Sequence, residues 1–339
     1  MQAVFSRRAV LAGAATAAAM MLPSGRSLAA EPVTVTMAIQ YGYAYLPVTV
    51  AEKLGLFAKQ GSAAGLPGLT VKIQKISGAP AINDALISGS IDIGAYGLPG
   101  MLIAAEKTRG SIDIRGLAAL VAGDNGLYTN KPEIKSLADF KPTDKIAVTS
   151  TTGQQGLLVR MAAAKAFGED QSRRLDTNMI QLPHPDATSA LLTGGTISAY
   201  AAPHPYSDIV EKSPNVRRLF FFSEYLGERV TSGLLASKRA FVEAQPQAAK
   251  AIVAAIDEAG AYIRANPRKA AEMFLESEKS SLDLDETERM LKSVSEEWGV
   301  QPKGVMSFGS FMAKAGLLKA PPAKWQDTFF APVAAGQGS

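Results

Sequence analysis

Ala85-Leu-Ile-Ser-Gly-Ser-Ile-Asp-Ile-Gly-Ala-Tyr96 decides the fold, because it returns with one residue fewer as Ala190-Leu-Leu-Thr-Gly-Gly-Thr-Ile-Ser-Ala-Tyr200. Each copy is typical of a helix end, a glycine stop and a buried strand. The copies begin about 105 residues apart. Such a duplicated unit predicts two similar lobes, and two lobes that face each other predict a cleft.

Strands and helices alternate around each copy, as they do in parallel sheets whose two faces are covered by helices. The first half of the chain predicts strands over 33–39, 69–76 and 91–95, with helices over 46–57 and 80–88. The second half predicts strands over 145–149, 177–182 and 197–200, with helices over 153–167 and 186–192. Gly89 and Gly194 follow the repeated helices, where a helix end favours a residue with positive φ.

The chain then returns to the first lobe through strands predicted over 218–222 and 232–237, and the remainder is helical. We therefore expect an α/β protein of two lobes, each a mostly parallel sheet flanked by helices. Two hinge segments, near 119–130 and 219–232, join the lobes. Lobe I comprises residues 31–121 plus 231–339, including the C-terminal helices, and lobe II comprises residues 122–230.

Residues 1–30 predict an export signal, with a basic start, an apolar middle and a small-residue cleavage site near Ala29/Ala30. Arg7 and Arg8 are similar to the twin-arginine signal, and an ordinary secretory signal is the alternative. Removal of this segment takes three arginines and lowers the formal net charge from +4 to +1. No basic block then remains, so we expect no nucleic-acid partner.

The chain contains no cysteine, which excludes thiol catalysis and thiolate metal sites. No nucleophile elbow and no phosphate-binding loop of the Gly-x-x-x-x-Gly-Lys type occurs in it. We therefore expect a binding protein and not an enzyme, with no cofactor and no metal. From the predicted export signal we expect a periplasmic protein, and we also expect a monomer.

Ligands of open parallel sheets bind beyond the carboxyl ends of the strands, in the crevice. In this sequence, that rule selects the loops that follow the predicted strands of both lobes. The candidate ligand-binding residues are Gln40, Tyr41, Tyr43, Ser77, Gly78, Tyr96, Thr151, Thr152, Gly153 and His204.

Two of these loops, Ser77-Gly78 and Thr151-Thr152-Gly153, precede predicted helices and are candidates for an anion site. Backbone N–H groups at a helix start, with hydroxyls beside them, favour a bound oxyanion. The alternative is that the hydroxyls only cap their own helices. The tyrosines likewise either line the pocket or pack between sheet and helix.

The two histidines, His184 and His204, both lie in Pro-His-Pro and are expected on loops of lobe II. They are either solvated or, for His204, in contact with the ligand. A metal site would need a third ligand such as Asp186 or Asp208, which makes it the weaker alternative.

Several sequence segments and their order along the chain resemble the periplasmic substrate-binding proteins of ABC importers for nitrate, taurine and alkanesulfonates, which are related to thiamine-precursor binders. The resembling segments are Ala51-Glu-Lys-Leu-Gly-Leu-Phe57, Ile76-Ser-Gly-Ala79, Leu86-Ile-Ser-Gly-Ser-Ile-Asp-Ile-Gly94, Ile134-Lys-Ser-Leu-Ala-Asp-Phe140, Lys145-Ile-Ala-Val148, Pro185-Asp186, Leu191-Leu-Thr-Gly194 and Asn266-Pro267. The resemblance implies the type II periplasmic binding protein fold.

The same resemblance implies capture of a small organic anion, such as a sulfonate, taurine or nitrate, and its delivery to a membrane permease driven by a cytoplasmic ATPase. Two departures lie in lobe II. Ser198 stands where the family usually carries an acidic residue, and Pro203-His204-Pro205 stands in place of an aromatic–acid–proline. The alternatives are an aromatic or pyrimidine-type ligand, or an enzyme of thiamine-pyrimidine or menaquinone precursor metabolism.

Overall fold

The computed structural model describes residues 32–280, 282–294, 297–331 and 333–339, which belong to one compact unit that begins at residue 31. The expected export signal over 1–30 and its cleavage site lie outside the described residues. Within the described ranges, no helix combines the length and the apolar character that a membrane crossing requires.

The first five-stranded sheet of the described chain has the order β2-β1-β3-β10-β4. Its strands are β1 (Thr34–Ile39), β2 (Thr70–Lys75), β3 (Ile93–Tyr96), β4 (Ile114–Gly123) and β10 (Val230–Lys238). β1 pairs parallel with β2 and β3, whereas β10 pairs antiparallel with β3 and β4. Four strands therefore run in one direction and β10 runs against them.

The second sheet repeats this pattern in the order β7-β6-β8-β5-β9. Its strands are β5 (Asn125–Thr129), β6 (Ile146–Val148), β7 (Met179–Gln181), β8 (Ala199–Pro203) and β9 (Arg217–Phe221). β6 pairs parallel with β7 and β8, whereas β5 pairs antiparallel with β8 and β9. The predicted two-lobed fold is confirmed, and each sheet is mixed because one strand is reversed.

The reversed strand of each sheet is the one through which the chain enters from the other sheet. β5 follows β4 after a single residue, Asp124, and β10 follows β9 across residues 222–229. An entering strand starts at the edge that faces the other lobe, where the remaining strands end. It must therefore run in the opposite direction, which hydrophobic periodicity does not reveal.

The duplicated phrase forms the same unit twice, as its sequence predicts. α3 (Ala79–Ser88) ends at Gly89 with φ 82°, and α6 (His184–Leu192) is followed by Gly194 with φ 70°. The strands that come next, β3 and β8, each hold the central position of their sheet. The repeat thus places one buried strand at the middle of each lobe.

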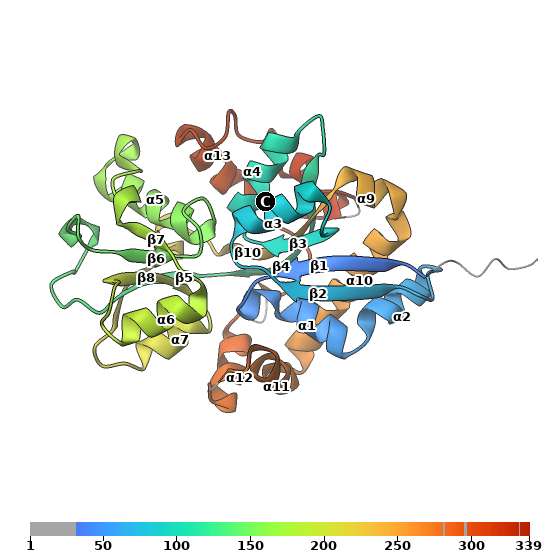
Figure 1. Ribbon diagram of the computed structural model, residues 1–339, viewed down its shortest axis with the longest axis horizontal. Helices are drawn as coiled ribbons and strands as arrows, with labels where there is room; N and C mark the ends of the chain where they lie inside the picture. Colours follow the sequence, from blue (N-terminus) through green and yellow to red (C-terminus); the bar gives the residue numbers. More distant parts are fainter. Residues whose placement is uncertain (1–31, 281, 295–296, 332) are drawn as a thin grey trace, which may run out of the picture. The chain divides into compact units, whose positions relative to one another are not determined.

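Helices cover both faces of each sheet (Figure 1). Around the first sheet lie α1 (Leu46–Lys53), α2 (Leu56–Ala63), α3, α4 (Leu98–Thr108), α9 (Arg239–Ala244) and α10 (Pro246–Ala265). Around the second lie α5 (Gln154–Phe167), α6, α7 (Tyr206–Glu211) and α8 (Ser223–Leu226). Figure 1 shows α5 on one face of this sheet, with α6 and α7 on the other.

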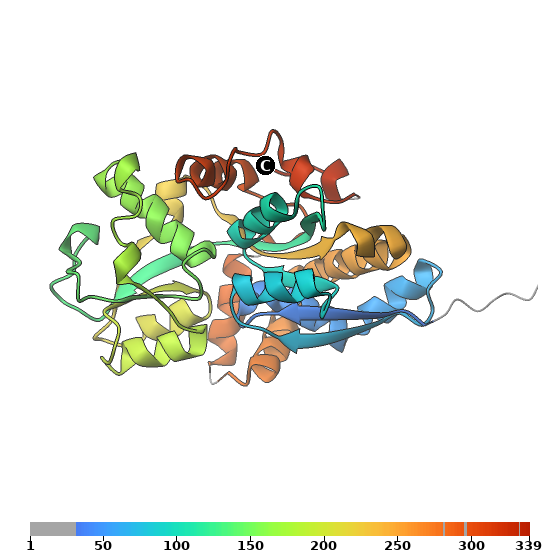
Figure 2. The same ribbon diagram turned by 45° about the horizontal axis from the view of Figure 1, so that its top comes forward.

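The C-terminal helices complete the first lobe. α10 packs on α1 and α2 through an apolar stripe that includes Ile252, Ile256 and Ile263, all buried. α11 (Pro267–Glu278) and α12 (Leu284–Ser293) follow below α1 in Figure 1, and α13 (Val305–Lys314) lies beside α4. The turned view of Figure 2 shows α13 and the C-terminus above the first sheet.

One side chain links the two crossings, which are the segments that connect the sheets at residue 124 and at residues 222–229. The Asp124 carboxylate accepts hydrogen bonds from the backbone N–H groups of Asn125 (2.9 Å) and Ser223 (3.0 Å), and from the Ser223 hydroxyl. Because Asp124 lies in the first crossing and Ser223 in the second, this cluster fixes one crossing against the other.

Candidate functional site

The strand ends of the two lobes meet at one junction, as the strand-end rule predicts. Three glycines of lobe I mark the contacts, since a Cβ added to them would approach lobe II closely. It would lie 3.8 Å from the His204 carbonyl oxygen at Gly42, 3.5 Å from the Thr149 carbonyl oxygen at Gly78, and 2.7 Å from the terminal amide group of Gln154 at Gly97.

Gln40 holds the lobe I side of this junction in place. Its Oε1 accepts a hydrogen bond from the Gly78 N–H (3.0 Å), and its Nε2 donates to the Tyr45 hydroxyl (3.1 Å). The side chain is buried and both ends of its amide have protein partners. Gln40 therefore joins the ends of β1 and β2 and positions Gly78.

The alternating tyrosines of the first loop diverge, because Gly42 has φ 111° and a short 3-10 helix follows at Tyr43–Tyr45. Tyr41 is half-buried beneath the Lys75 ammonium, 4.5 Å from its ring centroid. Tyr43 is buried, with its ring edge-on to His204 at 5.8 Å. Burial raises the pKa of the Tyr43 hydroxyl above its ordinary value, so this hydroxyl stays protonated.

Tyr96 lies inside lobe I. It is fully buried, and a Cβ added at Gly100 would lie 3.0 Å from its ring. Among the described residues, its hydroxyl has no hydrogen-bond partner. Tyr96 therefore packs between its sheet and α4, which was the alternative to ligand contact.

The two predicted anion loops end in glycine N-caps. Gly78 precedes α3 and Gly153 precedes α5, and neither helix start receives a side-chain capping hydrogen bond. The interpretation of the hydroxyls as caps was wrong. Ser77 is exposed, and Ser150 Oγ accepts instead from the Thr152 N–H at 3.2 Å, inside the loop. The backbone N–H groups of the first turns consequently have no such partner in the described chain.

Thr151 and Thr152 are half-buried beside Gly153. The Thr152 hydroxyl lies 3.2 Å from the Ser150 hydroxyl, so the two form a short hydroxyl pair in front of α5. Because Gly78 packs against Thr149, the helix start of lobe I and the loop before α5 in lobe II belong to the same junction.

Two glutamines at the start of α5 were missed from the sequence. With its amide nitrogen facing β10, Gln154 donates to the carbonyl oxygens of Thr231 (3.2 Å) and Ser232 (3.3 Å). Gln155 Oε1 accepts from the Thr149 hydroxyl at 2.9 Å. Both side chains are buried. Their position directly after the glycine of a strand-end loop was the signal that could have identified them.

His204 lies at the junction, next to a carboxylate of its own lobe. Its Nδ1 is 2.6 Å from Asp208 Oδ2 and 3.1 Å from the Ser207 hydroxyl. Because Ser207 and Asp208 approach the same ring nitrogen, the imidazole does not lie between them as a proton relay would require. The side chain is 19% exposed and contacts Tyr43 of lobe I.

His184 is not on a loop, which corrects the sequence prediction. Proline is tolerated in the first turn of a helix, so α6 begins at His184. Its Nδ1 lies 2.6 Å from the Tyr200 hydroxyl, and its ring stacks on Tyr206 with centroids 5.1 Å apart. Burial lowers the pKa of His184 to about 3, so the ring is neutral. Within the described ranges, no cluster of three His, Asp or Glu side chains is suited to hold a metal ion.

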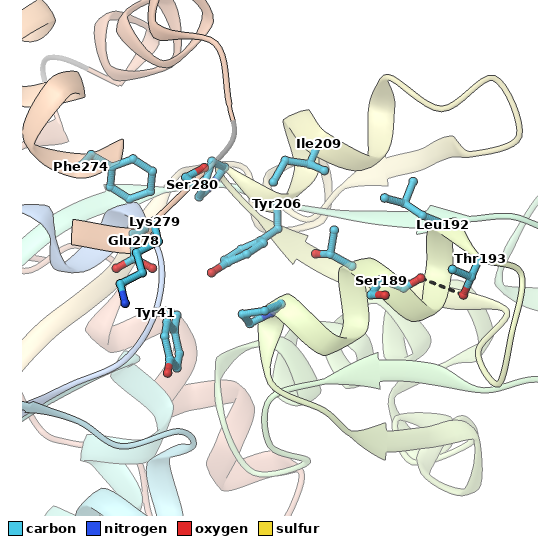
Figure 3. Close-up of a pocket in the computed structure, with 13 residues that line it drawn as sticks. Tyr41, Ser189, Leu192, Thr193, Tyr206, Ile209, Phe274, Glu278, Lys279 and Ser280 are labelled. Atoms are coloured by element: carbon cyan, nitrogen blue, oxygen red, sulfur yellow. Dashed lines mark hydrogen bonds between the residues drawn. The ribbon is translucent and has the colours of Figure 1, made fainter. Parts of the chain in front are cut away.

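A cavity of about 470 Å³ opens beside the junction (Figure 3). α6 and α7 of lobe II form one wall, and the end of α11 forms the other. Of the predicted ligand residues, only Tyr41 lines this cavity. The structure thus separates the predicted site into a junction group, which includes Gly78, Gly153 and His204, and Tyr41, which faces the cavity.

Two mixed sheets whose strand ends meet between two crossings define the periplasmic binding protein fold. The alkanesulfonate-binding protein of Xanthomonas axonopodis pv. citri, bound to MOPS, shares it with a TM-score of 0.70 and 18% identity, over 89% of this chain and 99% of that one. The nitrate-binding protein of Synechocystis PCC 6803 gives 0.59 and 17%, over 75% and 69%.

A comparison of sequences then identifies the family within this fold. Residues 28–275 match the model of the NMT1-like family, and the chain belongs to this family. A "Putative binding protein" of Brucella abortus (strain 2308) is 26% identical over 258 residues, which is 75% of each chain. The family resemblance predicted from the sequence is confirmed by this match.

Proposed function

We propose that this protein is the solute-binding component of an ABC import system and captures a small organic anion between its lobes. The observation that carries this proposal is the pair of helix starts, Gly78 and Gly153, without side-chain caps at one interlobe junction. An oxyanion there would receive backbone N–H groups and the positive ends of two helix dipoles.

The family and the fold neighbours support this ligand class, since two of those neighbours are described as alkanesulfonate- and nitrate-binding. Ligand contact would come from Ser77, Gly78, Thr151, Thr152 and Gly153, with His204 and Tyr43 at the edge of the junction. Gln40 and Gln154 would position these loops. Closure about the segments tied by Asp124 and Ser223 would enclose the ligand.

A thermal-shift screen with methanesulfonate, taurine, nitrate, aromatic acids and pyrimidines tests the ligand class. A ligand that binds only the folded state at 100 times its Kd stabilises the protein by about 2.7 kcal/mol. A shift with pyrimidines alone would contradict the anion proposal, and turnover of any of these compounds would contradict the assignment as a binding protein.

The transport role needs a separate test. We propose export to the periplasm through the signal over 1–30, with cleavage near Ala29/Ala30, and delivery of the ligand to a membrane permease with a cytoplasmic ATPase. Intact-mass measurement of the protein purified from the periplasm locates the cleavage. Stimulation of the reconstituted permease ATPase by the loaded protein, but not by a Gly153→Glu variant, tests delivery.

A further inference from the structure

The cavity beside the junction is large enough for an organic molecule. Its volume of about 470 Å³ lies within the range of roughly 300–1,000 Å³ that small-molecule sites occupy. Both lobes contribute to its walls, with Ser189 and Tyr206 on one side and Phe274 on the other (Figure 3). A ligand held here would therefore bridge the lobes.

The lining of this cavity is rich in rings and aliphatic groups. Tyr41, Tyr206 and Phe274 supply aromatic surface, and Leu192 and Ile209 supply aliphatic surface. Tyr206 is fixed by its stacking on His184, and Tyr41 by the Lys75 ammonium above its ring. Such rigid aromatic walls suit the apolar or planar body of an organic ligand.

Lys279 brings a positive charge to the cavity from an unusual backbone conformation. It ends α11 with φ 49° and ψ 41°, in the left-handed region where glycine is the default residue. The other non-glycine residue with positive φ in the described chain is Asp113, whose carboxylate pairs with Arg115 and Arg239. Asp113 therefore has an evident partner at its strained position.

Lys279 has no carboxylate partner within ion-pair distance among the described residues. Its neighbour Glu278 is already bound, since its carboxylate pairs with Lys75 at 2.6 Å and accepts from the Gly42 N–H at 3.4 Å. Lys75, which lies outside the cavity lining, therefore compensates the charge of Glu278, and the positive charge of Lys279 is left without a carboxylate partner in the described chain. A lysine in a backbone conformation that suits glycine better, at the wall of an aromatic cavity, points to a ligand.

We infer that this cavity holds the aromatic or aliphatic body of an organic anion, with the Lys279 ammonium paired to its anionic group. The inference rests on the proposed capture of an organic anion between the lobes and narrows that ligand class to anions with an aromatic or aliphatic body. It assigns the anionic group to Lys279 in this cavity, instead of to the helix starts at Gly78 and Gly153. The alternative role of Lys279 is to stabilise the end of α11 through the helix dipole. The two roles differ in what replacement by glycine does to stability.

Titration calorimetry at low ionic strength tests the inference with benzenesulfonate, methanesulfonate and nitrate as probes. We expect benzenesulfonate to bind most tightly to the wild-type protein. Lys279→Gly and Lys279→Met should weaken it about fivefold, the effect of losing one solvent-exposed ion pair. Lys250→Met, at an exposed lysine of α10, is the matched control and should change nothing. Ser189→Trp should obstruct the cavity and abolish binding.

The outcomes separate the inference from the proposed function. Benzenesulfonate binding that the Lys279 and Ser189 variants leave unchanged overturns the inference alone. Binding of methanesulfonate or nitrate without benzenesulfonate also overturns it and leaves the proposed function intact. Failure of all three anions overturns both. A Tm for Lys279→Gly well below that of the wild type assigns Lys279 to the helix end, and an equal or higher Tm supports the ligand role.

Discussion

Gly97→Ala should weaken ligand binding with little effect on the stability of lobe I. Gly97 has φ −74° and ψ 153°, which alanine adopts without strain. The added Cβ would lie 2.7 Å from the terminal amide group of Gln154 and 2.9 Å from Gln154 Cβ, closer than real Cβ atoms approach their neighbours. Because Gln154 belongs to the other lobe, this overlap opposes the arrangement in which the lobes meet.

The size of the effect follows from the cost of overpacking, which is typically about 1–3 kcal/mol. If this cost falls on the closed arrangement alone, the Kd of the ligand rises about fivefold to 150-fold. The loss of glycine at the N-cap of α4 adds a stability change of about 0.5 kcal/mol, which urea unfolding measures separately.

Calorimetry with the tightest ligand of the thermal-shift screen is the assay. Gly195→Ala is the matched control, since its Cβ would meet its nearest atom at an ordinary 3.6 Å. Gln154→Ala in the Gly97→Ala background should recover part of the affinity, because it removes the contact with the Gln154 amide group. An unchanged Kd for Gly97→Ala would refute the view that this contact belongs to the ligand-bound arrangement.

Three further predictions concern the pH dependence of stability, an exposed ion pair between the lobes, and the crossings between the sheets. The pKa of His184 is lowered from 6.5 to about 3 in the folded state, so below about pH 6.5 the unfolded chain binds a proton that the folded protein does not. The free energy of unfolding should therefore be highest above about pH 6.5 and fall by about 1.4 kcal/mol per pH unit toward pH 3. Urea titrations at pH 7 and 5 should show this loss, and His184→Gln should lack it. Lys314→Ala breaks an exposed interlobe ion pair with Glu169 (2.9 Å) and should change ligand affinity by less than about 1 kcal/mol in calorimetry; a larger loss contradicts solvent screening. Asp124→Ala should lower the free energy of unfolding by about 1–3 kcal/mol, measured in urea, because the donors of Ser223 lose their acceptor; no change would mean that the tie is dispensable.

Much of the fold could be predicted from the sequence, because glycines and apolar periods act locally. Gly89 and Gly194 end their helices as predicted, and Gly55, with φ 65°, breaks the first predicted helix into α1 and α2. The reversal of β5 and β10 could not be predicted. Strand direction within a sheet depends on where the chain enters, which is a property of the whole topology.

The candidate site was predicted as a set of loops more accurately than as a set of side chains. Tyr41, Tyr43 and Tyr45 share one spacing, yet the turn at Gly42 sends Tyr41 to the cavity and the other two inward. Lys279 carries no sequence signal at all, since a lysine at a helix end is ordinary until its φ is known.

The position of β10 determines the order in which the chain can fold during synthesis. β10 pairs with both β3 and β4, so these two strands have no direct contact in the finished sheet. All the strands of the second sheet are made before β10 leaves the ribosome. Lobe II can therefore complete its sheet first. Until β10 is available, β3 and β4 each keep one edge unpaired. A nascent chain whose residue 238 has left the ribosome should be the first to protect β4, and the edge of β3 that faces β10, from hydrogen exchange.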